Sequence, residues 1–338
     1  MYGLGLQARA ISPLCRPSNG SGVCHNFVVG SCCFSGANKI QLLTYHADTR
    51  LFECSATWAH EEEVCGIWGS PALAGPSLLG VSSPSCCRVF RVPDILAEEL
   101  QVVAEFNLKG AQILWDLNGP QNEVRVVAGN TLQVCSLSGD KIGSVIRALS
   151  VDGCTKVNSA AIDPHQPSVC LVVGEGVGLV VFDLRIKNPV SIPGTAALHG
   201  MGPTCAVDFS CTTTNRFLTA GGDGCVHFRD LRVDGSAYSV LMQNHIRAHE
   251  HCVLKALFNP SDDSLFISSS SDNTLRLWDF SGVTHEKEKP MCVKRLADFS
   301  DSVMDACWSS GSPWVFAGVS FNGKVLVDEA PGRCSRDS

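Results

Sequence analysis

The sequence lacks the features that mark several common classes of protein. It has no polybasic cluster, and its formal net charge of −7 argues against a general nucleic-acid binder. Its longest apolar stretch, 168–184, is broken by Glu175 and by glycines, so it does not reach the length of a membrane span. Residues 1–16 contain neither the basic nor the apolar segment of a signal peptide. We therefore expect a cytoplasmic protein that does not insert directly into a membrane.

Cysteine is abundant, but its arrangement excludes most cysteine chemistry. The chain has 18 cysteines and not one C-x-x-C pair, so neither a zinc ribbon nor a thioredoxin-type motif is supported. The adjacent pairs at 32–33 and 86–87 would point to opposite faces of a strand, which is poor geometry for a shared metal. Other cysteines, such as Cys135 and Cys170, lie within strand-like runs. We expect these to act as small buried hydrophobic side chains.

No pattern of catalytic, cofactor-binding or metal-ligating residues emerges. The glycine-rich segment 174–178 has no following Gly-Lys-Ser and no helix pattern, so it reads as a hairpin turn. No serine lies in a G-x-S-x-G elbow. The set His245, His249, His251 and Cys252 resembles a ligand group, but His249 has a structural explanation given below. We predict no enzyme activity, no cofactor and no bound metal.

What the sequence does contain is a repeat. The chain is 45% hydrophobic and 17% charged, so it can bury a sizeable core. The segments 124–139, 170–185, 217–232, 266–281 and 315–330 share one outline of short strand-like runs around a polar turn. Helical periodicity is scarce, and its strongest candidate, 94–106, reads equally well as a turn followed by an outer strand. A period of roughly 45–50 residues filled with short strands predicts an all-β propeller of four-stranded blades.

Seven such units account for the whole chain as one domain, 1–338. We place the blades at 1–57, 58–108, 109–150, 151–197, 198–246, 247–298 and 299–330. The chain ends soon after Asp328, so we predict that the last blade is incomplete or that its outer strand is reduced to 332–338. A propeller enzyme would need carboxylates or histidines that converge on the central channel, and the turn positions show none in register.

The stretch 249–279 resembles the WD40 repeat family. In that family a histidine, a serine or threonine, a turn aspartate and a strand tryptophan form a hydrogen-bonded chain within a blade. The resemblance implies that His249, Ser269, Asp272 and Trp278 play these parts here. Other blades depart from the pattern and would rely on apolar packing. Their tryptophan place holds Arg229, Phe182 or Cys135, and their aspartate place holds Asp223, Gly176 or Gly129.

Both ends of the chain narrow the resemblance further. Segments 2–14 and 301–327 are similar to WD40 proteins that interact with the Golgi-associated retrograde and endosome-associated recycling tethering complexes. This resemblance implies a non-enzymatic scaffold or adaptor that binds multisubunit vesicle-tethering complexes and supports endosomal recycling and retrograde trafficking. It also implies a monomer that is recruited peripherally from the cytoplasm to endosomes and the trans-Golgi network.

Three residues stand out as candidates for partner binding. Arg185 and Arg232 end Phe-Asp-Leu-Arg and Arg-Asp-Leu-Arg segments, and Trp314 is one of three tryptophans, with Trp68 and Trp115, that could be exposed. The two arginine segments resemble strand ends in substrate receptors of cullin-RING ubiquitin ligases, which gives an alternative adaptor function. A simpler explanation is that each arginine pairs with a neighbouring acid, and that Trp314 belongs to the core.

Overall fold

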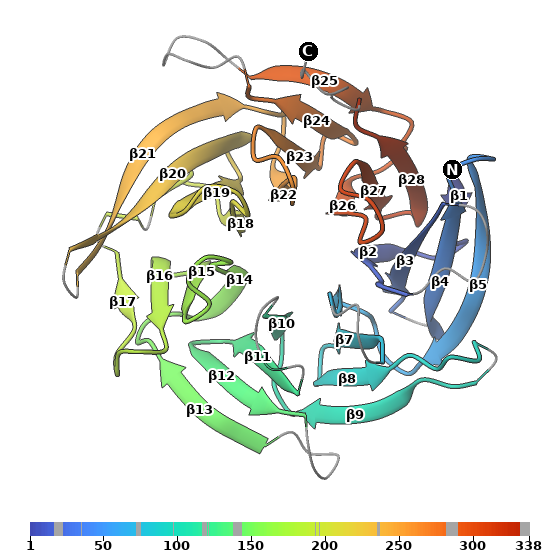
Figure 1. The fold of residues 1–338 in the computed structure, drawn as a ribbon, viewed down its shortest axis with the longest axis horizontal. Helices are drawn as coiled ribbons and strands as arrows, with labels where there is room; N and C mark the ends of the chain where they lie inside the picture. Colours follow the sequence, from blue (N-terminus) through green and yellow to red (C-terminus); the bar gives the residue numbers. More distant parts are fainter. Residues whose placement is uncertain are drawn as a thin grey trace, which may run out of the picture.

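The computed structural model consists of seven four-stranded antiparallel sheets arranged in a ring (Figure 1). It describes residues 1–16, 23–34, 36–71, 76–96, 98–116, 120, 122–137, 144–192, 194–195, 197–234, 237–281 and 290–331. Within these ranges there is no helix, and hence none long and apolar enough to cross a membrane. The all-β, seven-bladed propeller predicted from the repeat is confirmed.

In the first six blades the strands follow one another outward from the centre of the ring. The first blade contains β2 (Ala8–Pro13), β3 (Cys24–Ser31), β4 (Asn38–His46) and β5 (Leu51–His60). The second contains β6 (Gly66–Gly69), β7 (Leu78–Ser82), β8 (Cys87–Arg91) and β9 (Gln101–Phe106). The third contains β10 (Gln112–Leu114), β11 (Glu123–Ala128), β12 (Thr131–Ser136) and β13 (Ser144–Ser150).

The second half of the ring repeats this arrangement. The fourth blade contains β14 (Lys156–Ile162), β15 (Val169–Glu175), β16 (Gly178–Asp183) and β17 (Val190–Ser191). The fifth contains β18 (Thr204–Phe209), β19 (Arg216–Gly221), β20 (Cys225–Asp234) and β21 (Ala237–Arg247). The sixth contains β22 (Val253–Phe258), β23 (Leu265–Ser270), β24 (Leu275–Asp279) and β25 (Met291–Leu296).

The seventh blade closes the ring with a strand from the other end of the chain. Its inner strands are β26 (Val303–Trp308), β27 (Val315–Ser320) and β28 (Lys324–Glu329), and its outer strand is β1 (Tyr2–Gly3), antiparallel to β28. The prediction of an incomplete last blade was therefore wrong, because residues at the N-terminus supply the fourth strand. The segment 332–338, predicted as a remnant of that strand, lies outside the described residues.

The strand bounds can be compared with two other expectations. Segment 94–106 contains a turn followed by β9, so the outer-strand interpretation holds and the helix does not form. The fourth strand of the first blade, β5, continues to His60, three residues beyond the boundary we placed at 57. The long hairpin of β20 and β21 reaches outward beside the fourth blade (Figure 1).

The core is divided among the seams between blades. Seven clusters of buried hydrophobic residues each draw on two adjacent blades, and the last joins the seventh blade to the first. Because both faces of a blade are covered, inner strands are apolar on both sides, and every residue of β16 is buried. This explains why alternation between polar and apolar residues is weak in the sequence.

The innermost strands are also linked by hydrogen bonds from one blade to the next. Asp208 of β18 accepts the backbone N–H of Phe258 of β22 (2.9 Å), and Asp305 of β26 accepts the N–H of Ile11 of β2 (3.1 Å). The hydroxyl of Ser12 accepts the Gly69 N–H across the next seam (2.9 Å). These contacts fix the blades around a central cavity of about 340 Å³.

Candidate functional site

The sixth blade holds a chain of four hydrogen-bonded side chains from four successive segments. His249 lies before β22, Ser268 lies on β23, Asp272 lies in the turn after it and Trp278 lies on β24. The Trp278 indole N–H donates to the Ser268 hydroxyl (2.9 Å), and that hydroxyl contacts His249 Nε2 (2.7 Å). His249 Nδ1 lies 2.9 Å from Asp272 Oδ2. Because the carboxylate can only accept, Nδ1 carries the proton and Nε2 accepts from Ser268.

We had predicted Ser269 as the serine of this network. The serine that contacts both Trp278 and His249 is instead Ser268. Side chains alternate along β23, so Ser268 shares a face with Phe266, which stacks on Trp278 (6.0 Å between ring centroids). Ser269 points to the opposite face, and its buried hydroxyl makes no hydrogen bond. A shift of one residue along a strand moves a side chain to the other side of the sheet. His249, Asp272 and Trp278 are the other three members of the hydrogen-bonded chain.

Asp272 is held as a carboxylate by its neighbours. Its side chain is 6% exposed, and burial on its own would raise the pKa. Hydrogen bonds from His249 and Thr274 and the charge of Arg276 outweigh burial and lower the pKa of Asp272 well below its usual range. Burial lowers the pKa of His249, which keeps its ring neutral near pH 7. The network is therefore a neutral histidine bonded to an ionised aspartate.

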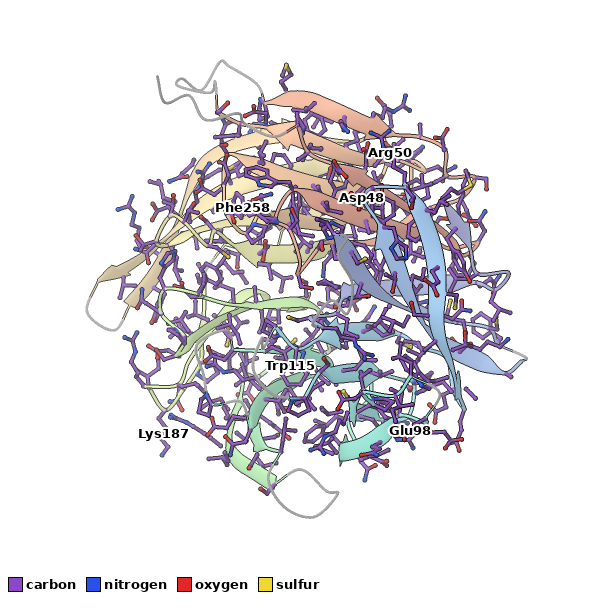
Figure 2. All side chains as sticks on the ribbon, turned by 45° about the vertical axis from the view of Figure 1, so that its right-hand side comes forward. Asp48, Arg50, Glu98, Trp115, Lys187 and Phe258 are labelled. Carbon is purple, nitrogen blue, oxygen red and sulfur yellow. The ribbon has the colours of Figure 1, made fainter. Side chains whose placement is uncertain are left out.

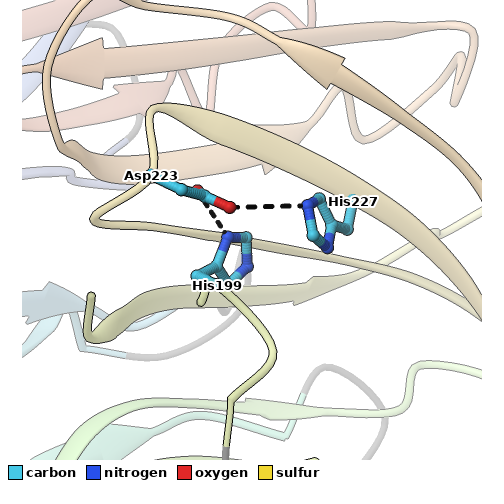
Figure 3. Close-up of side chains that lie close together, drawn as sticks. All are labelled: His199, Asp223 and His227. Carbon is cyan, nitrogen blue, oxygen red and sulfur yellow. Dashed lines mark hydrogen bonds and ion pairs between the residues drawn. The ribbon is translucent and has the colours of Figure 1, made fainter. Parts of the chain in front are cut away.

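The fifth blade carries a related network with arginine in the place of tryptophan. His199 Nδ1 lies 2.8 Å from Asp223 Oδ1 (Figure 3). His199 Nε2 lies 3.1 Å from the Thr219 hydroxyl. Arg229 donates from Nε to the same hydroxyl (3.3 Å). We had placed Asp223 and Arg229 but had missed His199 and Thr219. Spacing could have found His199, because it precedes Asp223 by 24 residues, as His249 precedes Asp272 by 23.

His199, Asp223 and His227 also form the kind of cluster that could hold a divalent metal, with ligand atoms within 4.8 Å of one another. Arg229 donates to His227 Nδ1 (2.8 Å), so the neutral ring carries its proton on Nε2, the atom that faces Asp223. Burial, together with the charges of His199 and Arg229, lowers the pKa of His227 to about 4. A metal would have to displace the proton on this nitrogen. His199 is hydrogen-bonded to Asp223, and His227 Nε2 lies 3.7 Å from the other carboxylate oxygen.

Arg185 and Arg232 line one recess of about 540 Å³ at the seam of the fourth and fifth blades. Their side chains are 56% and 60% exposed. Arg185 Nη2 lies 2.9 Å from Asp183 Oδ2, and Arg232 Nη2 lies 3.1 Å from Asp230 Oδ2. Each arginine thus pairs with the aspartate two residues before it. Sequence reasoning missed Tyr238, whose hydroxyl donates to Asp183 (2.8 Å) from the adjacent hairpin.

The three tryptophans considered as exposed candidates are partly buried. Trp314 packs against the cluster between the sixth and seventh blades, and Trp68 and Trp115 pack against the cluster between the second and third. The Trp115 indole N–H donates to the Trp68 carbonyl (3.0 Å). In the view of Figure 2, Trp115 is labelled, and Lys187 lies at the rim of the molecule. Arginines rather than tryptophans therefore mark the more accessible candidate surface.

A seven-bladed ring with a His–Ser–Asp–Trp network in one blade defines a WD40-repeat propeller. The chain belongs to the EIPR1 beta-propeller family, whose model matches residues 1–278. It is 23% identical to the EARP-interacting protein homolog of Gekko japonicus and 22% identical to the EARP and GARP complex-interacting protein 1 of Homo sapiens. Each alignment covers 98% of this chain and 96% of the relative. The WD repeat-containing protein DWA2 of Arabidopsis thaliana is 22% identical over 97% of this chain and 95% of its own length.

Proposed function

We propose that this chain is a non-enzymatic adaptor that binds multisubunit vesicle-tethering complexes of the EARP and GARP type. Two relatives that match 98% of it are named for such an interaction, one with EARP and the other with EARP and GARP. This is the single observation that carries the proposal. A rigid ring suits such a function, because its blades hold surface loops and edges in fixed positions for a partner.

The chemistry of the two networks supports a binding function over catalysis. Asp272 and Asp223 are each held by a histidine of the same blade, and the hydroxyls of Ser268 and Thr219 are engaged in the same chains. Such groups stabilise a blade, and because Ser268 and His249 are 0% and 2% exposed, a substrate cannot reach the serine hydroxyl. The chain acts as a monomer in the cytoplasm, and its tether partners recruit it to endosomes and the trans-Golgi network, where it supports endosomal recycling and retrograde trafficking.

The recess around Arg185 and Arg232 is the partner-binding surface in this proposal. Arginine and tyrosine are enriched among the residues that dominate binding energy, and the recess combines both arginines with Tyr238. Acidic groups of a tether subunit would compete for the guanidinium groups that now face Asp183 and Asp230. Trp314 has no part in this surface, because its ring packs on the core.

The alternative function, a substrate receptor of a cullin-RING ligase, rested on the two arginine-ending segments. The ion pairs of Arg185 with Asp183 and of Arg232 with Asp230 account for these arginines without a ligase. We therefore do not favour it.

Affinity purification of the tagged full-length chain, followed by mass spectrometry, tests the proposed function. Subunits of EARP or GARP are the expected partners, and subunits of a cullin-RING ligase in their place would contradict it. The double change Arg185→Gln and Arg232→Gln should reduce recovery of tether subunits at least about tenfold, because it removes two candidate anchors. Arg295→Gln, on the outer strand β25, is the matched control and should leave recovery unchanged.

A further inference from the structure

The inner strands carry a series of side chains that reach across the seams at intervals of 46 or 47 residues. Gln112 donates to the Asn158 carbonyl of the next blade (2.7 Å), and Asn158 donates to the Thr204 carbonyl of the blade after that (3.1 Å). The following member of the series is Cys205, and its partner across the next seam is Cys252. At the seam between the fifth and sixth blades, two thiols therefore meet where the two preceding seams have a side-chain amide that donates to a backbone carbonyl.

The two sulfur atoms are close and are fixed by different blades. Cys205 Sγ lies 3.6 Å from Cys252 Sγ. Cys205 lies at the bulge of β18, where the register with β19 shifts between Thr204 and Ala206. Cys252 immediately precedes β22, and its carbonyl accepts the Ser271 N–H of the same blade (3.1 Å). A disulfide requires about 2.05 Å between sulfurs, so the pair needs to close by only about 1.5 Å.

Both thiols are reachable and chemically distinct. Each residue is half-buried, and Cys205 lines the central cavity, which small solutes can enter. The two thiols share a hydrogen bond in which either sulfur can be the donor, and with Cys205 as the donor the bond lowers the pKa of Cys252 and raises the pKa of Cys205. Cys252 is therefore the nucleophile of the pair, and Cys205 is the thiol that can resolve an oxidised Cys252.

We propose that Cys205 and Cys252 are a site of oxidative modification, at which a peroxide converts the two thiols into a disulfide that joins the fifth and sixth blades. The Cys252 thiolate attacks one peroxide oxygen, the O–O bond breaks, and the departing hydroxide takes a proton to become water. Cys252 is then a sulfenic acid. Cys205 attacks its sulfur, the S–S bond forms, the S–O bond breaks, and the hydroxyl leaves as water with the thiol proton. The thiols lose two electrons, and the peroxide is reduced to two water molecules.

Peptide mapping of the full-length chain tests this site. The reduced protein is treated with hydrogen peroxide, remaining thiols are alkylated, and the digest is analysed without reduction. We expect a linked peptide pair containing Cys205 and Cys252 and a loss of two thiols from the 18 in the chain. Cys292, which is exposed on β25, should stay alkylatable at the same dose. Oxidation of Cys292 while Cys205 and Cys252 remain thiols would overturn the proposal.

Two variants separate a true pair from two independent cysteines. In Cys205→Ser, oxidised Cys252 has no resolving thiol, so capture of its sulfenic acid by dimedone should rise at least about tenfold over the wild type. Cys292→Ser should behave as the wild type does. Peroxide should raise the melting temperature by roughly 3 °C or more in the wild type and in Cys292→Ser, but not in Cys205→Ser. Equal dimedone capture with and without Cys205 would contradict a paired reaction.

Discussion

At the scale of single residues, two neighbouring blades build the same kind of hydrogen-bonded chain with different donors. The sixth blade ends its chain of hydrogen bonds in the Trp278 indole, whereas the fifth ends it in the Arg229 guanidinium. Both groups donate to a hydroxyl, from Ser268 or Thr219, that also contacts a histidine. Tryptophan adds a large apolar surface, and arginine adds a charge that must be balanced by Asp223. Loss of the family tryptophan therefore does not mean loss of the network.

The serine register gives the sharpest test at this scale. Ser268→Ala removes the acceptor of the Trp278 N–H and the partner of His249, so it should lower the free energy of unfolding by about 1–3 kcal/mol. Ser269→Ala removes a buried hydroxyl that makes no hydrogen bond, so it should be neutral or slightly stabilising. Urea unfolding of the two variants measures the difference. Equal losses would show that the register of β23 is wrong.

Trp278 should be important for stability through packing. Its side chain is 6% exposed and stacks on Phe266 in the cluster between the fifth and sixth blades. Trp278→Ala should lower the free energy of unfolding by about 3–5 kcal/mol, because it leaves a cavity. Trp278→Phe keeps most of the volume and should lose much less. Thermal unfolding of both variants checks this, and a silent Trp278→Ala would refute the packed position.

Asp208 should make stability depend on pH. Burial raises its pKa to about 7, against an ordinary value of 3.8. The native state therefore holds a proton that the unfolded chain releases, so this stabilisation is present below about pH 4 and is lost as pH rises towards 7.

Asp208→Asn cannot ionise and keeps an acceptor for the Phe258 N–H. At pH 8 it should exceed the wild type in stability by about 1–2 kcal/mol, whereas at pH 4 the two should agree. Urea titrations across this range measure the effect, with Asp48→Asn, an exposed carboxylate, as control. Parallel pH profiles for wild type and Asp208→Asn would contradict it.

At the scale of elements, the outer strands are the least uniform part of the ring. Two of them, β1 and β17, have only two residues each. The neighbouring hairpin of β20 and β21 supports β17, because Tyr238 packs into the cluster of that seam and bonds Asp183. The other short strand, β1, is secured by the turn before β28, where the Gly323 carbonyl accepts the Leu4 N–H (2.9 Å).

Gly323 should therefore be needed for closure of the ring. Its φ of 80° favours glycine, and an added Cβ would collide with the Leu6 carbonyl oxygen. Gly323→Ala should cost about 2–4 kcal/mol and should speed amide exchange in β1 and β28. Gly110 has a similar φ of 59° but open space around it, so Gly110→Ala should cost only about 1 kcal/mol. Hydrogen exchange that is unaltered in β1 would contradict this account.

The elements that could be predicted were those whose pattern is local. The period of the repeat and the blade that contains Trp278 could be predicted because their strands and turns follow one another directly in the sequence. Ser268 was missed because residues 268–271 are all serines, so the sequence does not show which of them faces Trp278. Only the strand register decides which face of the sheet each serine takes. The outer strand of the last blade was missed because its residues lie at the opposite end of the sequence.

At the scale of the whole molecule, the ring distributes its stability among equivalent seams. Each seam has an apolar cluster, and inner-strand hydrogen bonds such as those of Asp208 and Asp305 tie blade to blade. Because the blades are tied together at every seam, we expect the propeller to change shape little on binding. Its partners would then bind surfaces that are already formed. The recess of Arg185 and Arg232 is one such surface, and it spans two blades.

Direct binding between the purified chain and a purified tethering complex tests the central claim. Size-exclusion chromatography with light scattering would measure whether the two co-elute and in what ratio. We predict a stable complex with EARP or GARP that contains one copy of this chain. The double change Arg185→Gln and Arg232→Gln should weaken it, and Arg295→Gln should not. Separate elution of the folded wild-type chain and the intact tether at micromolar concentrations would contradict the adaptor function.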